Sequence, residues 1–286
     1  MRLKLLETGQ KPMAQTNNNT TNKLTNQELS IQISLSGLSF CILNRQSNSI
    51  VYLKESYFDK KCNPLEVLDY LKHLFNTEDV LNSHFDKVFI IHDNELSVQV
   101  PKPLFNEEGL ADYLKFNSKI LKSDYITYDI ISENDIVNVY VPYININNFI
   151  YDKFGDFTFK HVSTVLIEEI LRIEKNAKHL KFYVNIDKDH FEAIVVDNGK
   201  LLFYNTFNYA SKEDFIYYIL FVAEQLSLNP ETFNLVLIGD IKAHDYLYNI
   251  AYKYIRNVDF GHRTDTFKFE SMPATNYSNF TLLKSI

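Results

Sequence analysis

The side chains of this chain that are best suited to chemistry lie where short apolar segments end. Hydroxyl groups and backbone amides at such turns can hold phosphate, whereas carboxylates can hold a divalent cation. A bound cation would orient a phosphate group or activate a water molecule. The candidates for such a site are Ser34, Ser36, Asn185, Asp187, Lys188, Gly239 and Asp240.

The acidic candidates are concentrated in the second half of the chain. Asp187, Asp189, Glu192 and Asp240 lie there, and Asp187 and Asp240 could approach each other at adjacent strand ends. A single divalent cation is one interpretation of this group. We favour the other, a solvated acidic rim, and predict no metal site.

Histidine offers a weaker signal. The eight histidines include no close pair of the His-x-x-x-His kind that binds zinc. His92, Asp93 and His190 nevertheless fall at strand ends, where they could border a cleft. They remain secondary candidates.

The composition excludes several function classes. Only 7 of 286 residues are glycine, where average usage gives roughly 20, so glycine-rich phosphate loops are not expected. The net charge is −7 without a dense Lys/Arg run, which argues against nucleic-acid partners. Two cysteines and no apolar stretch of membrane-spanning length indicate free thiols, a cytoplasmic location and no membrane span.

The elements that must position these residues form a strand meander followed by alternating helices and strands. Apolar residues alternate from Leu29 to Tyr52, with two polar turns between them, which predicts three strands. Pro64 opens a segment with helical apolar spacing, and the run from Val88 to Ile91 is typical of a strand buried on both faces. A further helix is expected over 110–121, and strands are expected over 125–131 and 136–141.

The second half repeats this pattern. After a helix expected over 161–178, a second meander matches the first at a shift of 151 residues, which brings Leu29 onto Leu180 and Phe40 onto Phe191. The later elements recur in the same order, so each half reads β-β-β-α-β-α-β, with 109–120 matching 244–255. We interpret this as an internal duplication. It predicts two α/β lobes, each a mixed sheet flanked by helices, with a cleft between them.

The segments LSIQISLSGLSFCIL, VPKPLF with LADYLKFN, and HVSTVLIEEIL resemble a family of Bacteroidetes-type bacteria, domain of unknown function 3822, over about residues 28–275. The paired meanders also resemble the actin-like ATPase superfamily, whose lobes are ribonuclease H-like. This superfamily includes actin, sugar kinases and bacterial pilus-assembly proteins. The resemblance implies a duplicated two-lobe actin-like ATPase fold, but the family brings no known activity.

The superfamily resemblance also implies a nucleotide site in the interlobe cleft, and this chain departs from its three motifs. The first turn, at Ser34 and Ser36, lacks the acid of Asp-x-Gly. In the second motif, Asn185 to His190, carboxylates of Asp187 and Asp189 would repel phosphate by several kcal/mol. Lys188 either offsets part of that charge or is a solvated turn lysine. In the third motif Gly239 fits, but Asp240 replaces its partner glycine.

These departures favour a non-catalytic interaction or scaffold protein that has a protein partner and no cofactor. The sequence does not determine the oligomeric state. The alternative is a weak nucleotide-binding protein, an ATPase or phosphotransferase that uses ATP and Mg²⁺ with Ser34, Ser36, Lys188 and Asp240. The sequence leaves open whether Met1 or Met13 is the start. The expected parts are a disordered tail over 1–27, a first lobe over 28–150, a second lobe over 151–275 and a C-terminal tail over 276–286.

Overall fold

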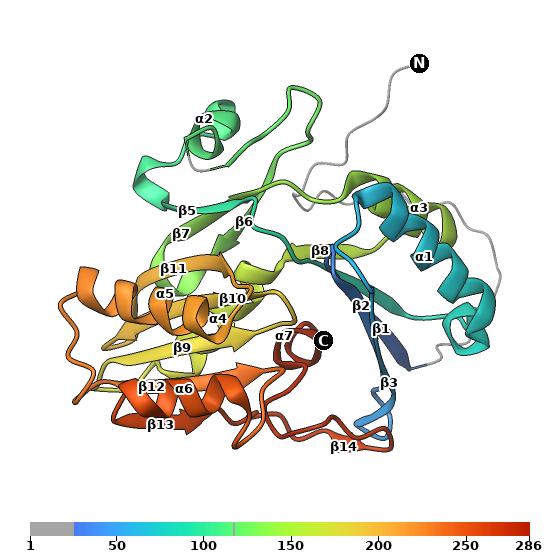
Figure 1. Ribbon diagram of the computed structural model, residues 1–286. Coiled ribbons are helices and arrows are strands. Elements are labelled where there is room, and N and C mark those ends of the chain that lie inside the picture. The colour runs from blue at the N-terminus through green and yellow to red at the C-terminus, as the bar shows by residue number, and fades with distance from the viewer. Residues whose placement is uncertain (1–25, 117) are drawn as a thin grey trace.

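The computed structural model describes residues 26–116 and 118–286. Most of the tail expected over 1–27 lies outside the described residues, and Gln27 already begins the first strand. The described chain is a mixed α/β structure with three sheets and helices on their faces (Figure 1). The predicted class is therefore confirmed.

The first sheet has six strands. From edge to edge they are β14 (Lys268–Phe269), β3 (Ser49–Tyr57), β2 (Gly37–Asn44), β1 (Gln27–Ile33), β4 (Lys87–His92) and β8 (Thr158–His161). One face is covered by α1 (Pro64–Thr77) and α3 (Ile144–Phe154), which bury Leu71 and Ile150 against Ile31. α1 begins at the predicted proline. We call this sheet with α1 and α3 the first lobe.

The second sheet has five strands. They are β11 (Lys200–Asn208), β10 (His190–Asp197), β9 (Lys181–Ile186), β12 (Asn234–Gly239) and β13 (Asn257–Phe260). Its outer face is covered by α5 (Lys212–Gln225) and α6 (Tyr246–Tyr254), which bury Ile219 and Ala251 against Val184. We call this sheet with α5 and α6 the second lobe.

The two sheets share one strand order. β3-β2-β1-β4-β8 corresponds to β11-β10-β9-β12-β13, so the predicted order β-β-β-α-β-α-β is found in both halves. The predicted alignment is wrong by two residues, however. Ile33 and Ile186 end equivalent strands, so Ser34 corresponds to Asp187 and not to Asn185. A slip of two residues leaves the apolar alternation unchanged, because side chains in a strand repeat with period two.

The first lobe also carries an insertion that the sequence reading misassigned. It is a three-stranded sheet of β5 (Ser97–Pro101), β7 (Ile136–Tyr140) and β6 (Thr127–Ile131), with α2 (Leu110–Leu114) beside it. β6 and β7 confirm the two predicted strands. The helix expected over 110–121 ends at Leu114, which is buried in the insertion's core, whereas Leu121 beyond its end is 64% exposed. α3 and β8 instead provide the second helix and last strand, so the first sheet continues beyond the boundary expected at residue 150.

The last helix of each half packs on the sheet of the other half. α4 (Val162–Ile173), shorter than the helix expected over 161–178, buries Ile167 against Ile194 of the second sheet. α7 (Phe280–Lys284) lies between the lobes in Figure 1 and buries Leu282 and Leu283 against Leu43 of the first sheet. The segment 276–286 is therefore not the tail that the sequence predicts, because its apolar residues cover a sheet face. Every helix in the described part of the chain is too short or too polar to cross a bilayer.

Candidate functional site

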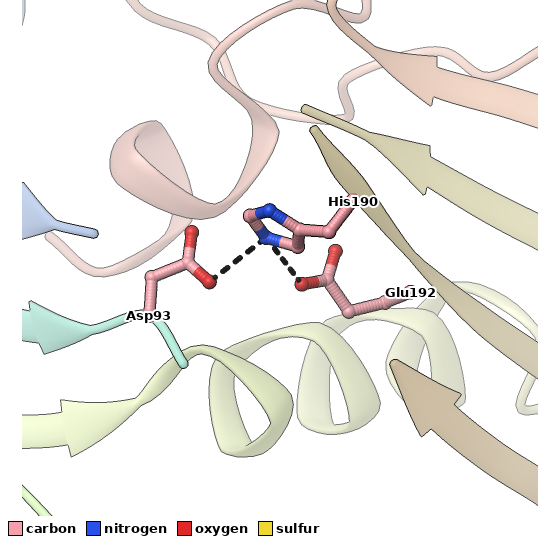
Figure 2. A group of neighbouring side chains, drawn as sticks. All are labelled: Asp93, His190 and Glu192. Atoms are coloured by element: carbon pink, nitrogen blue, oxygen red, sulfur yellow. Dashed lines mark hydrogen bonds and ion pairs between the residues drawn. The ribbon is translucent and has the colours of Figure 1, made fainter. Parts of the chain in front are cut away.

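The two lobes meet at a buried cluster of Asp93, His190 and Glu192 (Figure 2). Asp93 directly follows β4 of the first lobe, whereas His190 and Glu192 lie on β10 of the second. His190 Nε2 is 3.2 Å from Asp93 Oδ1 and 3.4 Å from Glu192 Oε1. All three residues are buried, and Glu192 is fully so.

Regular strand geometry brings these side chains together. Asp93 N–H donates to the carbonyl oxygen of Ile33 at 2.8 Å, which continues the β1–β4 ladder by one residue. His190 and Glu192 are two positions apart on β10, so both side chains point to the same face of that strand. The cluster therefore lies where the end of β4 in the first sheet faces the start of β10 in the second sheet.

A second layer of polar side chains fixes the orientation of the cluster. Asp189 Oδ1 is 2.9 Å from His190 Nδ1. Gln32 Nε2 donates to Asp93 Oδ2 at 2.9 Å, and Asn185 Nδ2 donates to Glu192 Oε2 at 2.9 Å. These three contacts leave Asp93 Oδ1, His190 Nε2 and Glu192 Oε1 directed at one another.

The cluster is an electrostatic unit. Burial alone would lower the pKa of His190, but the carboxylates of Asp93, Asp189 and Glu192 raise it well above the ordinary histidine value. Burial opposes ionisation of Asp93, yet the neighbouring imidazolium lowers the pKa of that carboxyl. Burial raises the pKa of Glu192. A charged His190 paired with Asp93 is thus the state favoured in the absence of any ligand.

The first turn uses its own serine to satisfy its amides. Ser34 Oγ accepts hydrogen bonds from the backbone N–H of Ser36 at 3.2 Å and of Gly37 at 3.0 Å. The hydroxyls of Ser34 and Ser36 are 3.0 Å apart, and both residues are buried. The structure thus brings these two predicted residues together, but it leaves the two amides with no free hydrogen for a phosphate oxygen.

The second turn is built in the same way from a carboxylate. Asp187 Oδ1 accepts a hydrogen bond of 2.6 Å from the backbone N–H of Lys188, and burial raises the pKa of Asp187 to about 7. Lys188 Nζ donates to the carbonyl oxygen of Phe58 in the first lobe at 2.5 Å. Lys188 therefore connects the two lobes, a role that the sequence reading missed.

The glycine of the third motif, Gly239, is required by the backbone. Gly239 has a φ of +88°, and a Cβ there would lie 2.3 Å from the carbonyl oxygen of Ile186. Only glycine fits this close approach of β12 to β9. Gly239 is therefore accounted for by strand packing without any nucleotide.

Asp240 is exposed and lines the same interlobe cavity as Asp187, as the sequence suggested. The cavity has a volume of about 50 Å³, and residues 278–282 form part of its wall. Small-molecule pockets are usually about 300–1,000 Å³. The amides of Ser36, Gly37 and Lys188 are bonded to side chains of their own turns, and the cavity is far smaller than a nucleotide pocket. The cleft in this form therefore does not accommodate ATP, although the carboxylates of Asp187 and Asp240 are ligands that Mg²⁺ takes.

Two buried histidines near the cluster are structural. His92 Nε2 is 2.9 Å from Asn147 Oδ1 and His92 Nδ1 accepts from the N–H of Tyr143, and burial lowers the pKa of His92 to about 3. His161, which the sequence reading did not single out, caps α4 by accepting from the N–H of Ser163 at 3.1 Å. The residue type gave no signal for this role, because N-caps are usually Ser, Thr, Asp or Asn.

Comparisons with known proteins agree with this fold. The family model described as "Protein of unknown function (DUF3822)" matches residues 16–258. A crystal structure from Bacteroides thetaiotaomicron, of a protein with actin-like ATPase fold and unknown function, is 26% identical with a TM-score of 0.75. The match covers 86% of this chain and 94% of that chain.

A second structure shares the fold at low identity. It is a PilM–PilN type IV pilus biogenesis complex, 9% identical with a TM-score of 0.54, and the match covers 85% of this chain and 90% of that chain. Among curated proteins, none matches this chain in sequence. The family resemblance inferred from the three segments and the fold resemblance inferred from the paired meanders are both confirmed.

Proposed function

Because this chain belongs to the DUF3822 family of unknown function and has an actin-like ATPase fold, we propose that it is a non-catalytic interaction protein of the cytoplasm. One observation carries the proposal. The backbone amides at the two turns that would face phosphate are bonded to the chain's own Ser34 Oγ and Asp187 Oδ1. We also attribute the shared strand order of the two sheets to internal duplication, after which the phosphate-binding groups were lost.

The exposed aromatic rings of the second lobe support a protein partner. Tyr217 on α5 and Tyr246 and Tyr252 on α6 are 61%, 58% and 62% exposed. A groove of about 640 Å³ lies between the two helices and is lined by Tyr217 and Tyr246. Exposed tyrosines are enriched in protein interfaces. The PilM–PilN complex is a protein complex that contains a chain of similar fold. It supports a protein partner for this chain only by analogy of fold.

Thermal unfolding with ATP and Mg²⁺ tests the loss of nucleotide binding. We expect the same melting temperature with and without ATP, with sodium sulfate at equal ionic strength as the control. A ligand at 100 times its Kd would stabilise the native protein by about 2.7 kcal/mol. An ATP-specific rise in melting temperature would favour the alternative, a weak nucleotide-binding protein.

Quantitative co-purification from the native cell tests the interaction role. A Tyr217→Ser and Tyr252→Ser double variant is expected to lose a partner that the wild type retains. The matched control is Tyr151→Ser on α3, because Tyr151 is 48% exposed but lies in the first lobe. Equal recovery of all proteins with the double variant and the control would contradict a partner on this face.

A further inference from the structure

We propose that Asp93, His190 and Glu192 form a binding site for one small divalent transition-metal ion such as Zn²⁺. One ligating atom from each residue lies within 4.8 Å of the others, and all three residues are buried. The set contains one imidazole and two carboxylates, which are ligands that Zn²⁺ takes in proteins. Three protein ligands leave a fourth position for water or a partner's side chain.

The distances between the ligand atoms suit a tetrahedral ion. Zinc bonds of about 2.0–2.2 Å place neighbouring ligand atoms of a tetrahedron about 3.3–3.5 Å apart. His190 Nε2 is 3.2 Å from Asp93 Oδ1 and 3.4 Å from Glu192 Oε1. Two edges of the coordination polyhedron are therefore already present, and Figure 2 shows the three side chains converging from both lobes.

The outer contacts are those that a metal site requires. A ligating histidine commonly donates its other ring N–H to a carboxylate, which fixes the tautomer and the ring orientation. Here Asp189 takes that position at His190 Nδ1. Gln32 and Asn185 hold the second oxygens of Asp93 and Glu192, so each ligand presents one atom to the centre.

An unsatisfied buried atom points independently to a ligand. Glu192 is fully buried, and its Oε1 makes no hydrogen bond, although it lies 3.4 Å from His190 Nε2 in an ion pair. The hydroxyl of Tyr204 is also buried without a partner, and its pKa is raised by burial and by the nearby Glu192 carboxylate. Buried polar atoms are normally hydrogen-bonded, so an exception calls for an explanation. A cation bound at Oε1 would give this atom a direct ligand bond.

A metal ion at this site would join the lobes. Asp93 belongs to the first lobe and the other two ligands to the second. The Asp189 side chain, which contacts His190, is 35% exposed, so this side of the cluster borders solvent. The ion competes with the proton that otherwise occupies His190 Nε2, so the experiment must distinguish a metal site from an imidazolium pair.

Titration of the full chain with Co²⁺ tests the proposal, since tetrahedral Co²⁺ gives strong visible absorption. We expect one Co²⁺ per chain in the tetrahedral form, displaced by Zn²⁺, and a melting temperature raised by either ion. Glu192→Gln should weaken binding at least about tenfold, and Asp189→Asn, which removes only the outer charge, should weaken it less. The matched control is Glu28→Gln. Glu28 is a buried carboxylate that pairs with Arg45 and lies away from His190.

The Co²⁺ titrations distinguish a metal site from an imidazolium–carboxylate pair. Loss of the tetrahedral spectrum in the Glu192 variant with retention in the Glu28 variant supports the site. Absence of tetrahedral Co²⁺ in the wild type leaves an imidazolium pair only and overturns the proposal, as does equal binding by wild type and Glu192→Gln. If Glu192→Gln fails to fold by circular dichroism, Asp93→Asn and the partly exposed Asp189→Asn serve the same comparison.

Discussion

Leu282→Ala should destabilise the whole protein, although the sequence assigns this residue to a tail. Leu282 is fully buried in a cluster with Leu43 and Ile50 of the first sheet. Removing a buried leucine side chain costs about 2–5 kcal/mol, because apolar surface is lost and a cavity remains. Typical stabilities of 5–15 kcal/mol make this a large fraction of the total.

Urea unfolding followed by circular dichroism measures the effect, and tyrosine fluorescence serves as a second probe because the chain has no tryptophan. The matched control is Leu65→Ala in the first turn of α1, where the leucine is 68% exposed. We expect the control to change stability by less than about 0.5 kcal/mol. A Leu282→Ala loss no larger than that of the control would show that α7 is detached in solution and would refute the reasoning.

Three further predictions concern the backbone and pH. Gly239→Ala should cost about 1–3 kcal/mol from its left-handed backbone alone, and the 2.3 Å approach of its Cβ to Ile186 O should add to that cost; unchanged thermal stability would contradict the close approach to Ile186. Burial lowers the pKa of His92 in the folded protein to about 3, so the unfolded state binds more protons below about pH 6.5. The free energy of unfolding should therefore fall as the pH drops below about 6.5, and it should fall less steeply in His92→Gln. Urea titrations between about pH 4 and 7 measure this. Asp129 has a folded pKa raised by burial to about 6, so the folded state binds more protons between about pH 4 and 6; its contribution should fall by about 3 kcal/mol as pH rises through that window, and an identical pH profile for Asp129→Asn would contradict it.

The elements could be predicted where local patterns decide them. Pro64 and the alternation from Leu29 onward identified α1 and both meanders, because helix starts and strand faces are read from neighbouring residues. α3 was missed because its Asn-rich sequence over 144–148 alternates like a loop or strand. The two-residue slip between the turns was also invisible, since apolar alternation repeats every second residue.

The candidate site could be predicted only residue by residue. His190, Glu192 and Asp93 were each singled out, but their proximity depends on how one lobe sits against the other, which no local pattern encodes. The roles of Ser34 and Asp187 as acceptors for their own turn amides were likewise unreadable from residue type. A serine or aspartate at a turn can bond its own backbone or a ligand, and only the folded geometry decides.

The crossing of α4 and α7 has a consequence for synthesis of the protein in the cell. Five of the six strands of the first sheet are complete by residue 161, yet the helix that covers its inner face is residues 280–284. Translation at 5–20 residues per second leaves roughly 6–24 s between the two. During that interval Cys41, Leu43 and Ile50 have no α7 to cover them. We therefore expect the nascent first half to expose an apolar face of the kind that chaperones bind. Mutations near residue 282 should reduce the yield of soluble protein before they alter any binding.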